Sequence, residues 1–183
     1  MNVTGKFIEI SGPYNKTKMA CKIATSALHP NEQNQVLILD CDGAIKVDKI
    51  MKNCKDPKDF ENRIHLHRIF DWDEYQMTLA LLPDLLFKFP LVNMIVIDGL
   101  SNPYLTSDNK KQQHRNSNQH ISRLYSILEP YNVTCVITTT TPSSGDFEFG
   151  KNQLIRITLT GENGKCLVQD AATDKPVEID FES

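Results

Sequence analysis

The sequence predicts an α/β fold: one domain with a mainly parallel sheet flanked by helices and an antiparallel hairpin at one edge. Up to about residue 140, short runs rich in Val, Ile and Leu alternate with amphipathic helical patterns. Strand–helix alternation of this kind gives parallel strands joined by right-handed crossovers. After residue 150 strand-like runs follow each other closely, with the turn-forming pair Asn163-Gly164 between two of them.

Five strands are expected before the hairpin. They are 7–10, 36–39, 64–70, 92–97 and 133–138. The second, fourth and fifth are nearly continuous hydrophobic runs, which are typical of parallel strands covered by helices on both faces. Three further strands are expected at the antiparallel edge. They are 154–160, 166–171 and 176–181.

Three helices are expected between the first strands, over residues 18–28, 72–87 and 117–128. The second begins behind Asp71, with a glutamate three residues later in a capping-box pattern. Pro83 lies inside this helix and should kink or divide it, because proline removes a backbone donor and crowds the preceding turn.

The composition excludes several classes of protein. With 183 residues, 40% hydrophobic and 23% charged, the chain resembles an ordinary soluble domain, and no apolar run is long enough to cross a membrane. The net charge of −3 gives no global basic field, so nucleic acid would need a local patch. Five cysteines without C-x-x-C spacing indicate reduced, intracellular thiols. His65 and His67 have no third ligand at a suitable spacing, so no metal site is expected.

The segment "SGPYNKTKM" follows the first strand, where a phosphate-binding loop would lie. Gly12 and Lys18 hold the first and seventh places of G-x-x-x-x-G-K-[ST]. In this register Thr17 replaces the second glycine, and Met19 replaces the hydroxyl that would hold Mg²⁺.

A second register of the same segment stays open. It takes Lys16 and Thr17 as the lysine–hydroxyl pair, with Asn15 as the residue that tolerates left-handed backbone. This register shortens the loop by two residues. An ordinary strand–helix turn is the third interpretation.

Carboxylates end two other predicted strands. Asp40 and Asp42 follow the second strand in "LILDCDGA", and Asp98 ends the fourth in "NMIVIDGL". Open α/β sheets bind ligands at this carboxyl edge, where a carboxylate can polarise water or orient Mg²⁺. A solvated turn around Gly43 and a strand that simply ends in aspartate are the plain alternatives.

The chain resembles the core domain of RecA-type recombinases, especially the eukaryotic recombinases and their paralogues. The resemblance rests on the order of three features: the loop after the first strand, the carboxylate pair after the second, and the aspartate that ends the fourth. "GPYNKTKM" is similar to a degenerate first Walker motif, and "NMIVIDGL" to the second. "LILDCDGA" is similar to the Asp-x-Glu-Gly turn, with Asp42 in place of the catalytic glutamate. "VTCVITTT" resembles the sensor strand, and residues 155–181 resemble the closing hairpin and last strand. The resemblance implies a single P-loop, RecA-like core over 1–183 with no amino-terminal helical domain before it.

The departures from this family pattern imply a member without efficient hydrolysis. The second glycine, the Mg²⁺ hydroxyl, the glutamate and the sensor glutamine (here Thr139 or Thr140) are all replaced. The resemblance then implies that the nucleotide site is vestigial. If the site does work, ATP and Mg²⁺ would be its cofactors. Its residues would be Gly12, Lys16, Thr17, Lys18 and Asp98.

The nearest functional class is that of the small paralogues found in Shu-type complexes. Such a protein would pair with another recombinase paralogue and stabilise or remodel the recombinase filament on single-stranded DNA. The resemblance thus implies an accessory role in homologous recombination and DNA repair, and a nuclear location.

Two loops would decide what such a protein contacts. Residues 101–120 are polar and carry side chains suited to a phosphate backbone and to base stacking. These side chains are Tyr104, Lys110, Lys111 and Arg115. Residues 141–152 carry Phe147 and Phe149, aromatic side chains that commonly anchor protein interfaces. A solvated connector and packing onto the sheet edge are the plain alternatives.

Three other functions stay open. A weak DNA-stimulated ATPase would use Lys18, Asp42 and Asp98 with a metal held indirectly. A direct single-stranded DNA-binding module would act through residues 101–120. A small-molecule kinase with an unusual phosphate loop is the last, and it would lack an Arg-rich lid segment.

Overall fold

The structure is a computed structural model of the chain. It describes residues 5–13, 15–28, 33–54, 56–100, 121–139, 154–159, 165–170 and 177–180. The strands are β1 (Phe7–Ser11), β2 (Gln35–Asp40), β3 (Ile64–Arg68), β4 (Val92–Asp98), β5 (Thr134–Thr139), β6 (Leu154–Leu159), β7 (Lys165–Asp170) and β8 (Val177–Asp180). The helices are α1 (Lys16–Ser26), α2 (Val47–Asn53), α3 (Pro57–Arg63) and α4 (Trp72–Lys88), with a further helical stretch at 121–128 and the 3₁₀ turn η1 (Glu129–Tyr131).

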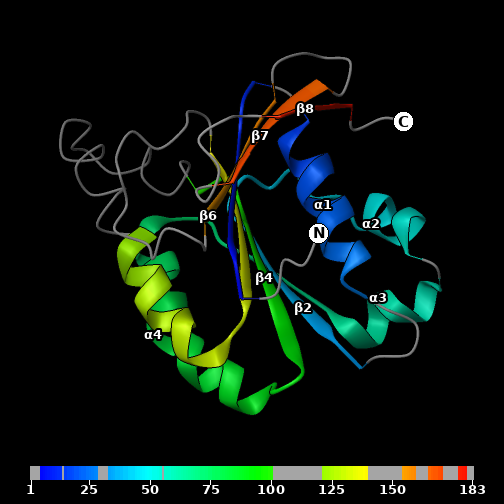
Figure 1. Ribbon diagram of the computed structural model, residues 1–183. Helices are drawn as coiled ribbons and strands as arrows, with labels where there is room; N and C mark the ends of the chain where they lie inside the picture. The colour runs from blue at the N-terminus through cyan, green and yellow to red at the C-terminus, as the bar shows by residue number, and fades with distance from the viewer. Residues whose placement is uncertain are drawn as a thin grey trace.

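The strands form one eight-stranded sheet in the order β3-β2-β4-β5-β1-β6-β7-β8 (Figure 1). The six strands from β3 to β6 are parallel to their neighbours. β7 is antiparallel to both β6 and β8. The α/β class, the mainly parallel sheet and its antiparallel edge are therefore confirmed, whereas the Asn163-Gly164 turn lies outside the described residues.

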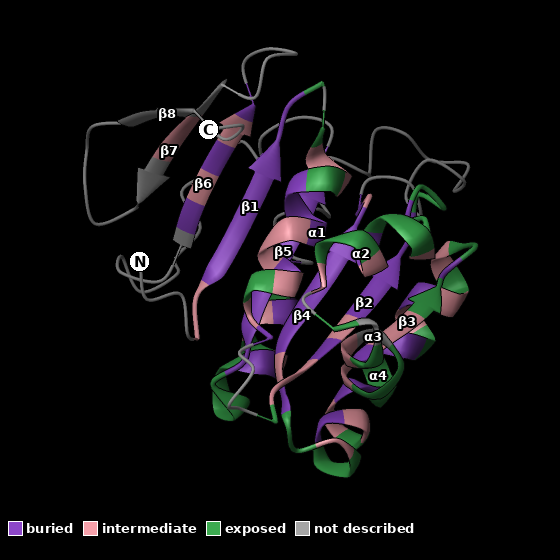
Figure 2. Cartoon of the chain, turned by 90° about the vertical axis from the view of Figure 1, so that its right-hand side faces the viewer, coloured by how far each residue is buried: buried purple, intermediate pink, exposed green. Residues whose placement is uncertain are grey.

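Helices cover both faces of the sheet and enclose two hydrophobic clusters (Figure 1). On one face, α4 and the 121–128 helix bury residues such as Leu79 and Leu124. On the other face, α1 and α2 bury Ala20 and Ile50 (Figure 2). Two buried faces explain the continuous hydrophobic runs, since every residue of β1 and of β5 is buried.

The connection between β2 and β3 differs from the sequence-based expectation, because it contains two helices, α2 and α3. Each has only seven residues, and Ile50 is the one buried side chain described in α2. Two turns are too few for a clear hydrophobic period, so the pattern gives no signal. α1 also begins earlier than expected, at Lys16, and α4 runs undivided through Pro83 to Lys88.

The capping of α4 agrees with the expected pattern. The Asp71 side chain accepts a hydrogen bond from the backbone N–H of Glu74, and the Glu74 carboxylate accepts one from the backbone N–H of Phe70. Within the described residues, the structure contains no helix long and apolar enough to span a bilayer.

Gly12 is the position where the backbone leaves β1, and replacing it should be costly. Its φ is +127°, and a Cβ there would lie 2.5 Å from the carbonyl oxygen of Leu159. Gly12→Ala should lower the free energy of unfolding by at least about 2 kcal/mol, because both the conformation and the contact exclude a side chain. Urea denaturation measures this.

Gly43→Ala is the matched control. Gly43 has a φ of +65° but no atom within 4 Å of the added Cβ, so only the left-handed conformation costs energy, about 1 kcal/mol. Equal losses in the two variants would contradict the role assigned to the contact with Leu159.

Candidate functional site

The loop between β1 and α1 forms the first part of the site, at the carboxyl edge of the sheet. Asn15 precedes α1 with φ 57° and ψ 12°, a left-handed conformation that glycine adopts most readily. The helix begins at Lys16, and the backbone N–H of Met19 donates to the carbonyl of Asn15 at 2.9 Å. Asn15 therefore takes the backbone conformation that a second loop glycine would supply.

Asp98, at the end of β4, is the centre of the site and joins three elements. Its Oδ2 accepts a hydrogen bond of 2.8 Å from the Thr17 hydroxyl on α1. Its Oδ1 accepts one of 2.7 Å from the Thr138 hydroxyl on β5. Thr138 in turn accepts a bond from the backbone N–H of Gly99. A single carboxylate thus positions the start of α1 against two strands.

The electrostatic environment of Asp98 opposes its negative charge. The residue is 1% exposed, and burial raises the pKa of its carboxyl. The two threonine hydroxyls lower the pKa, whereas the carboxylates of Asp40 and Asp42 raise it again. A proton or a cation would relieve this concentration of negative charge.

Asp40 is the direct neighbour of Asp98 in the sheet, because these residues pair across β2 and β4. It is also 1% exposed, and neither carboxylate oxygen makes a hydrogen bond of good geometry with a described residue, although backbone N–H groups of the turn lie close by. Burial raises the pKa of its carboxyl. The backbone N–H groups of the turn at 42–45 and the Arg68 guanidinium oppose this effect. The Nε of Arg68 lies 3.7 Å from Asp40 Oδ2, so Asp40 keeps unused acceptor capacity.

Asp40 and Asp98 also lie at the ends of two adjacent strands that are followed by helices on opposite faces of the sheet. After β2 the chain enters α2 on one face of the sheet, and after β4 it crosses to the face that carries the 121–128 helix (Figure 1). Adjacent strands with such diverging connections form a topological switch point, the usual ligand crevice of open α/β sheets.

The structure distinguishes the two registers of the phosphate loop by where it places their residues. Lys18 lies on the exposed face of α1, and Met19 is buried in the core with 4% exposure. Lys16 and Thr17 are half-buried at the edge, with the Thr17 hydroxyl on Asp98. The shorter register is thus the one that brings its hydroxyl to Asp98 at the end of β4.

The remaining predicted residues lie beside this site, away from it, or outside the described part of the chain. Asp42 is exposed in the turn after β2, against Gly99. Thr139 donates a hydrogen bond to Glu9 rather than to the site. The following lie outside the described residues: Tyr104, Lys110, Lys111, Arg115, Thr140, Phe147 and Phe149.

The two strand histidines lie at the edge of the sheet. His65 Nε2 is hydrogen bonded to Gln35 at 2.9 Å, and His67 Nε2 lies 3.7 Å from the Glu74 carboxylate. Among the described residues, no group of three or more potential ligands could hold a metal ion.

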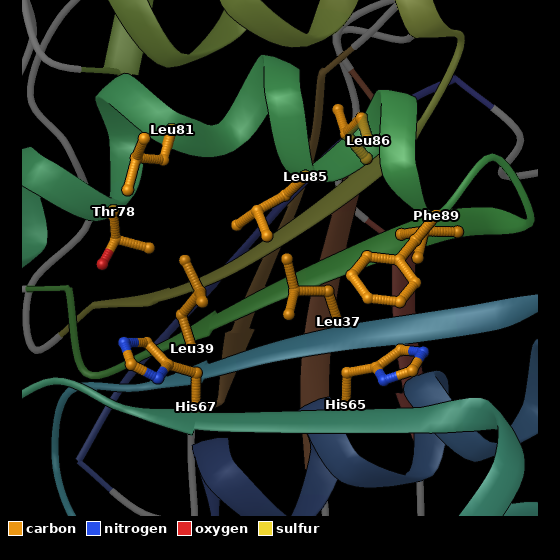
Figure 3. Close-up of a pocket in the computed structure, with 10 residues that line it drawn as sticks. Leu37, Leu39, His65, His67, Thr78, Leu81, Leu85, Leu86 and Phe89 are labelled. Atoms are coloured by element: carbon orange, nitrogen blue, oxygen red, sulfur yellow. The ribbon is translucent and has the colours of Figure 1, made fainter.

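An apolar groove of about 310 Å³ was missed from the sequence (Figure 3). It lies between α4 and the edge strands β2 and β3. Its lining includes Leu39, His65, His67, Leu81, Leu85 and Phe89. The sequence does not reveal the groove, because it does not show that β3 is the terminal strand of the described sheet. No described strand lies beyond β3, so one side of α4 has no further strand to pack against.

A buried ion pair in the sheet was also missed. Glu9, in the middle of β1, is 2% exposed, and its Oε2 lies 3.3 Å from the Nε of Arg156 on β6. Its Oε1 accepts a bond of 3.4 Å from Thr139. The only signal in the sequence is one charged residue inside each of two apolar runs, "FIEIS" and "LIRITL".

Asp40→Asn should make the protein more stable at neutral pH. Because burial raises the folded-state pKa of Asp40, the stability of the wild type falls as pH rises through that pKa. Asparagine removes the buried charge, so we expect a gain of about 1 kcal/mol at pH 7 that disappears towards pH 4. Urea denaturation at both pH values tests this, and a less stable variant at pH 7 would contradict it.

The chain matches no protein-family model, and no curated protein is significantly similar to it in sequence.

Proposed function

We propose that this chain is a RecA-like recombinase paralogue of the P-loop class that acts by binding rather than by catalysis. It pairs with another paralogue and, with that partner, stabilises or remodels the recombinase filament on single-stranded DNA. This places it in homologous recombination and DNA repair, in the nucleus. The observation that carries the proposal is the hydrogen bond from Thr17 to Asp98 beneath a shortened phosphate loop.

The hydrogen bond supports the P-loop class. In P-loop proteins, the hydroxyl after the loop lysine and the aspartate of a neighbouring strand both serve the same Mg²⁺. Here the corresponding groups, on α1 and β4, lie 2.8 Å apart although 81 residues separate them in the chain. The left-handed Asn15 before Lys16 completes the match to the shorter register.

The same geometry argues against efficient turnover. A loop shortened by two residues offers fewer backbone N–H groups to surround a triphosphate. Asp42 is one methylene shorter than glutamate and lies in an exposed turn, so it is poorly placed to hold an attacking water.

A weak ATPase is the second candidate, and one observation favours it. Asp40 and Asp98 are buried side by side with raised pKa values, and Asp40 has unused acceptor capacity. Such a pair could hold a cation next to Lys16, since perturbed carboxyls concentrate at functional sites.

The apolar groove supports the pairing half of the proposal. β3 is the terminal strand of the sheet and pairs with β2 on one side, which leaves its other edge for a strand from elsewhere. Leu81 on α4 is 55% exposed at the groove, and the Phe89 ring packs against His65 with centroids 5.0 Å apart. We propose that the partner paralogue adds an extended segment to β3 and inserts an apolar side chain into the groove.

Nucleotide turnover tests the catalytic half. We expect no phosphate release above background from the wild-type protein with ATP and Mg²⁺, either alone or with its co-purified partner. If ATP binds, Lys16→Ala should weaken the binding at least tenfold, whereas Lys18→Ala should not, because Lys16 is the lysine that precedes the Thr17 hydroxyl on Asp98 and Lys18 precedes the buried Met19. Fluorescent ATP titration and phosphate release measure the two steps. Hydrolysis that depends on Lys16 would overturn the non-catalytic proposal in favour of the weak ATPase.

Substitution in the groove tests the pairing half. Leu81→Asp should weaken the heterodimer with the co-expressed paralogue at least thirtyfold, because a charge in an apolar anchor pocket costs about 2 kcal/mol or more. The matched control is Phe87→Asp on the same helix, where an 86% exposed apolar residue lies outside the groove lining. Analytical ultracentrifugation measures both. Equal pairing in the two variants would contradict a partner site in the groove.

A further inference from the structure

The charged side chains of this protein are divided between the two faces of the sheet. α1 carries three lysines and no acidic residue, and α2 with its N-cap carries three lysines and one aspartate. The lysines outside the phosphate loop, Lys18, Lys22, Lys46, Lys49 and Lys52, are called the α1–α2 lysine face. On the opposite side, α4 with its N-cap carries four acidic residues and one lysine. A chain with net charge −3 thus concentrates positive charge on one pair of helices.

The two helices hold their lysines side by side. Ile50 of α2 packs into the same hydrophobic cluster as Ala20 of α1, which fixes the helices against each other. Burial raises the pKa of the Cys21 thiol on α1 to about 11, and the Lys49 ammonium on α2 is close enough to oppose that rise. Figure 2 shows the exposed residues of α2 beside α1, above the sheet.

The lysines are also presented to solvent in a regular row. Lys46, at the N-cap, and Lys49 and Lys52, within α2, are all exposed and recur every third residue, and three helical residues advance the backbone by about 4.5 Å. Lys18 on α1 is exposed as well. A row of point charges at regular intervals complements a polymer whose phosphates are also regularly spaced.

The chemistry of this face favours nucleic acid over a protein partner. Protein interfaces are usually anchored by large apolar or aromatic side chains. Among the described residues, the exposed large hydrophobic side chains all lie outside α1 and α2. Neither helix contains an arginine or an aromatic residue, so the face offers no bidentate or stacking group that could read a base.

We propose that the α1–α2 lysine face binds the phosphate backbone of nucleic acid without reading its sequence. This site is distinct from the loop at 101–120 and from the nucleotide site, and it does not depend on the proposed function. It lies on the opposite face of the sheet from the apolar groove, which is formed with α4 (Figure 1). A partner in the groove would therefore leave the lysine face accessible.

The experiment compares the full-length wild type with K46Q/K49Q/K52Q, since glutamine removes the charge and keeps the helix propensity. The probes are a fluorescein-labelled oligothymidylate of about 30 nucleotides and a duplex of the same length. Fluorescence anisotropy between about 50 and 200 mM salt gives the affinity and its salt dependence. The control, K88Q/R123Q, removes positive charge from α4 and the 121–128 helix, on the opposite side of the sheet from the lysine face.

We expect K46Q/K49Q/K52Q to bind at least tenfold more weakly at low salt, with the log–log salt slope reduced by about two to three. The control variant should stay within about threefold of the wild type, because Lys88 and Arg123 lie on the opposite side of the sheet. The duplex and single-stranded arms show which form the face prefers, and a loss in either one supports the proposal. Lys49→Glu alone should weaken binding in the same direction, which covers the case that the triple variant folds poorly.

Two results would overturn the proposal. One is wild-type affinity in K46Q/K49Q/K52Q, or an equal loss in K88Q/R123Q, which would assign binding to other residues or to net charge. The other is tighter binding of a polyglutamate peptide than of either nucleic acid, with the same lysine dependence. That result would assign the face to an acidic protein segment.

Discussion

The carboxylate of Asp98 is the constraint on which the rest of the structure depends. It is buried at the end of a central strand, where an ionised group is costly unless hydrogen bonds satisfy it. The hydroxyls of Thr17 and Thr138 supply those bonds and, in doing so, set where α1 begins relative to β4 and β5.

The sheet separates two kinds of surface. The α4 side is acidic and contains the apolar groove at the free edge of β3, whereas the α1–α2 side is basic and has no exposed large hydrophobic side chain among its described residues. The central strands contribute buried residues to both hydrophobic clusters, so each surface rests on the same rigid layer. A molecule in the apolar groove and another on the α1–α2 lysine face would therefore not compete for the same surface.

The features that sequence predicted well are those carried by local patterns. The continuous hydrophobic runs identified β2, β4 and β5, and the Asp71–Glu74 spacing identified the start of α4. Those that it did not predict depend on distant contacts. The second register of the loop already named Asn15 as the left-handed residue, but periodicity alone placed the helix start two residues too late, at Lys18. The groove exists because β3 ends the sheet among the described strands. The side-chain bond from Thr138 to Asp98 spans 40 residues and has no local signature.

The ion pair between Glu9 and Arg156 affects the register in which β6 pairs with β1. β6 is the last parallel strand to join the sheet, and hydrophobic residues alone would tolerate several alignments against β1. Side chains alternate between faces, so a slip of one residue would turn Arg156 into the apolar cluster beneath α1 and leave Glu9 without its cation. The ion pair therefore specifies the register between β1 and β6. Because β7 pairs with β6 and β8 pairs with β7, the positions of these two antiparallel strands depend on the same register.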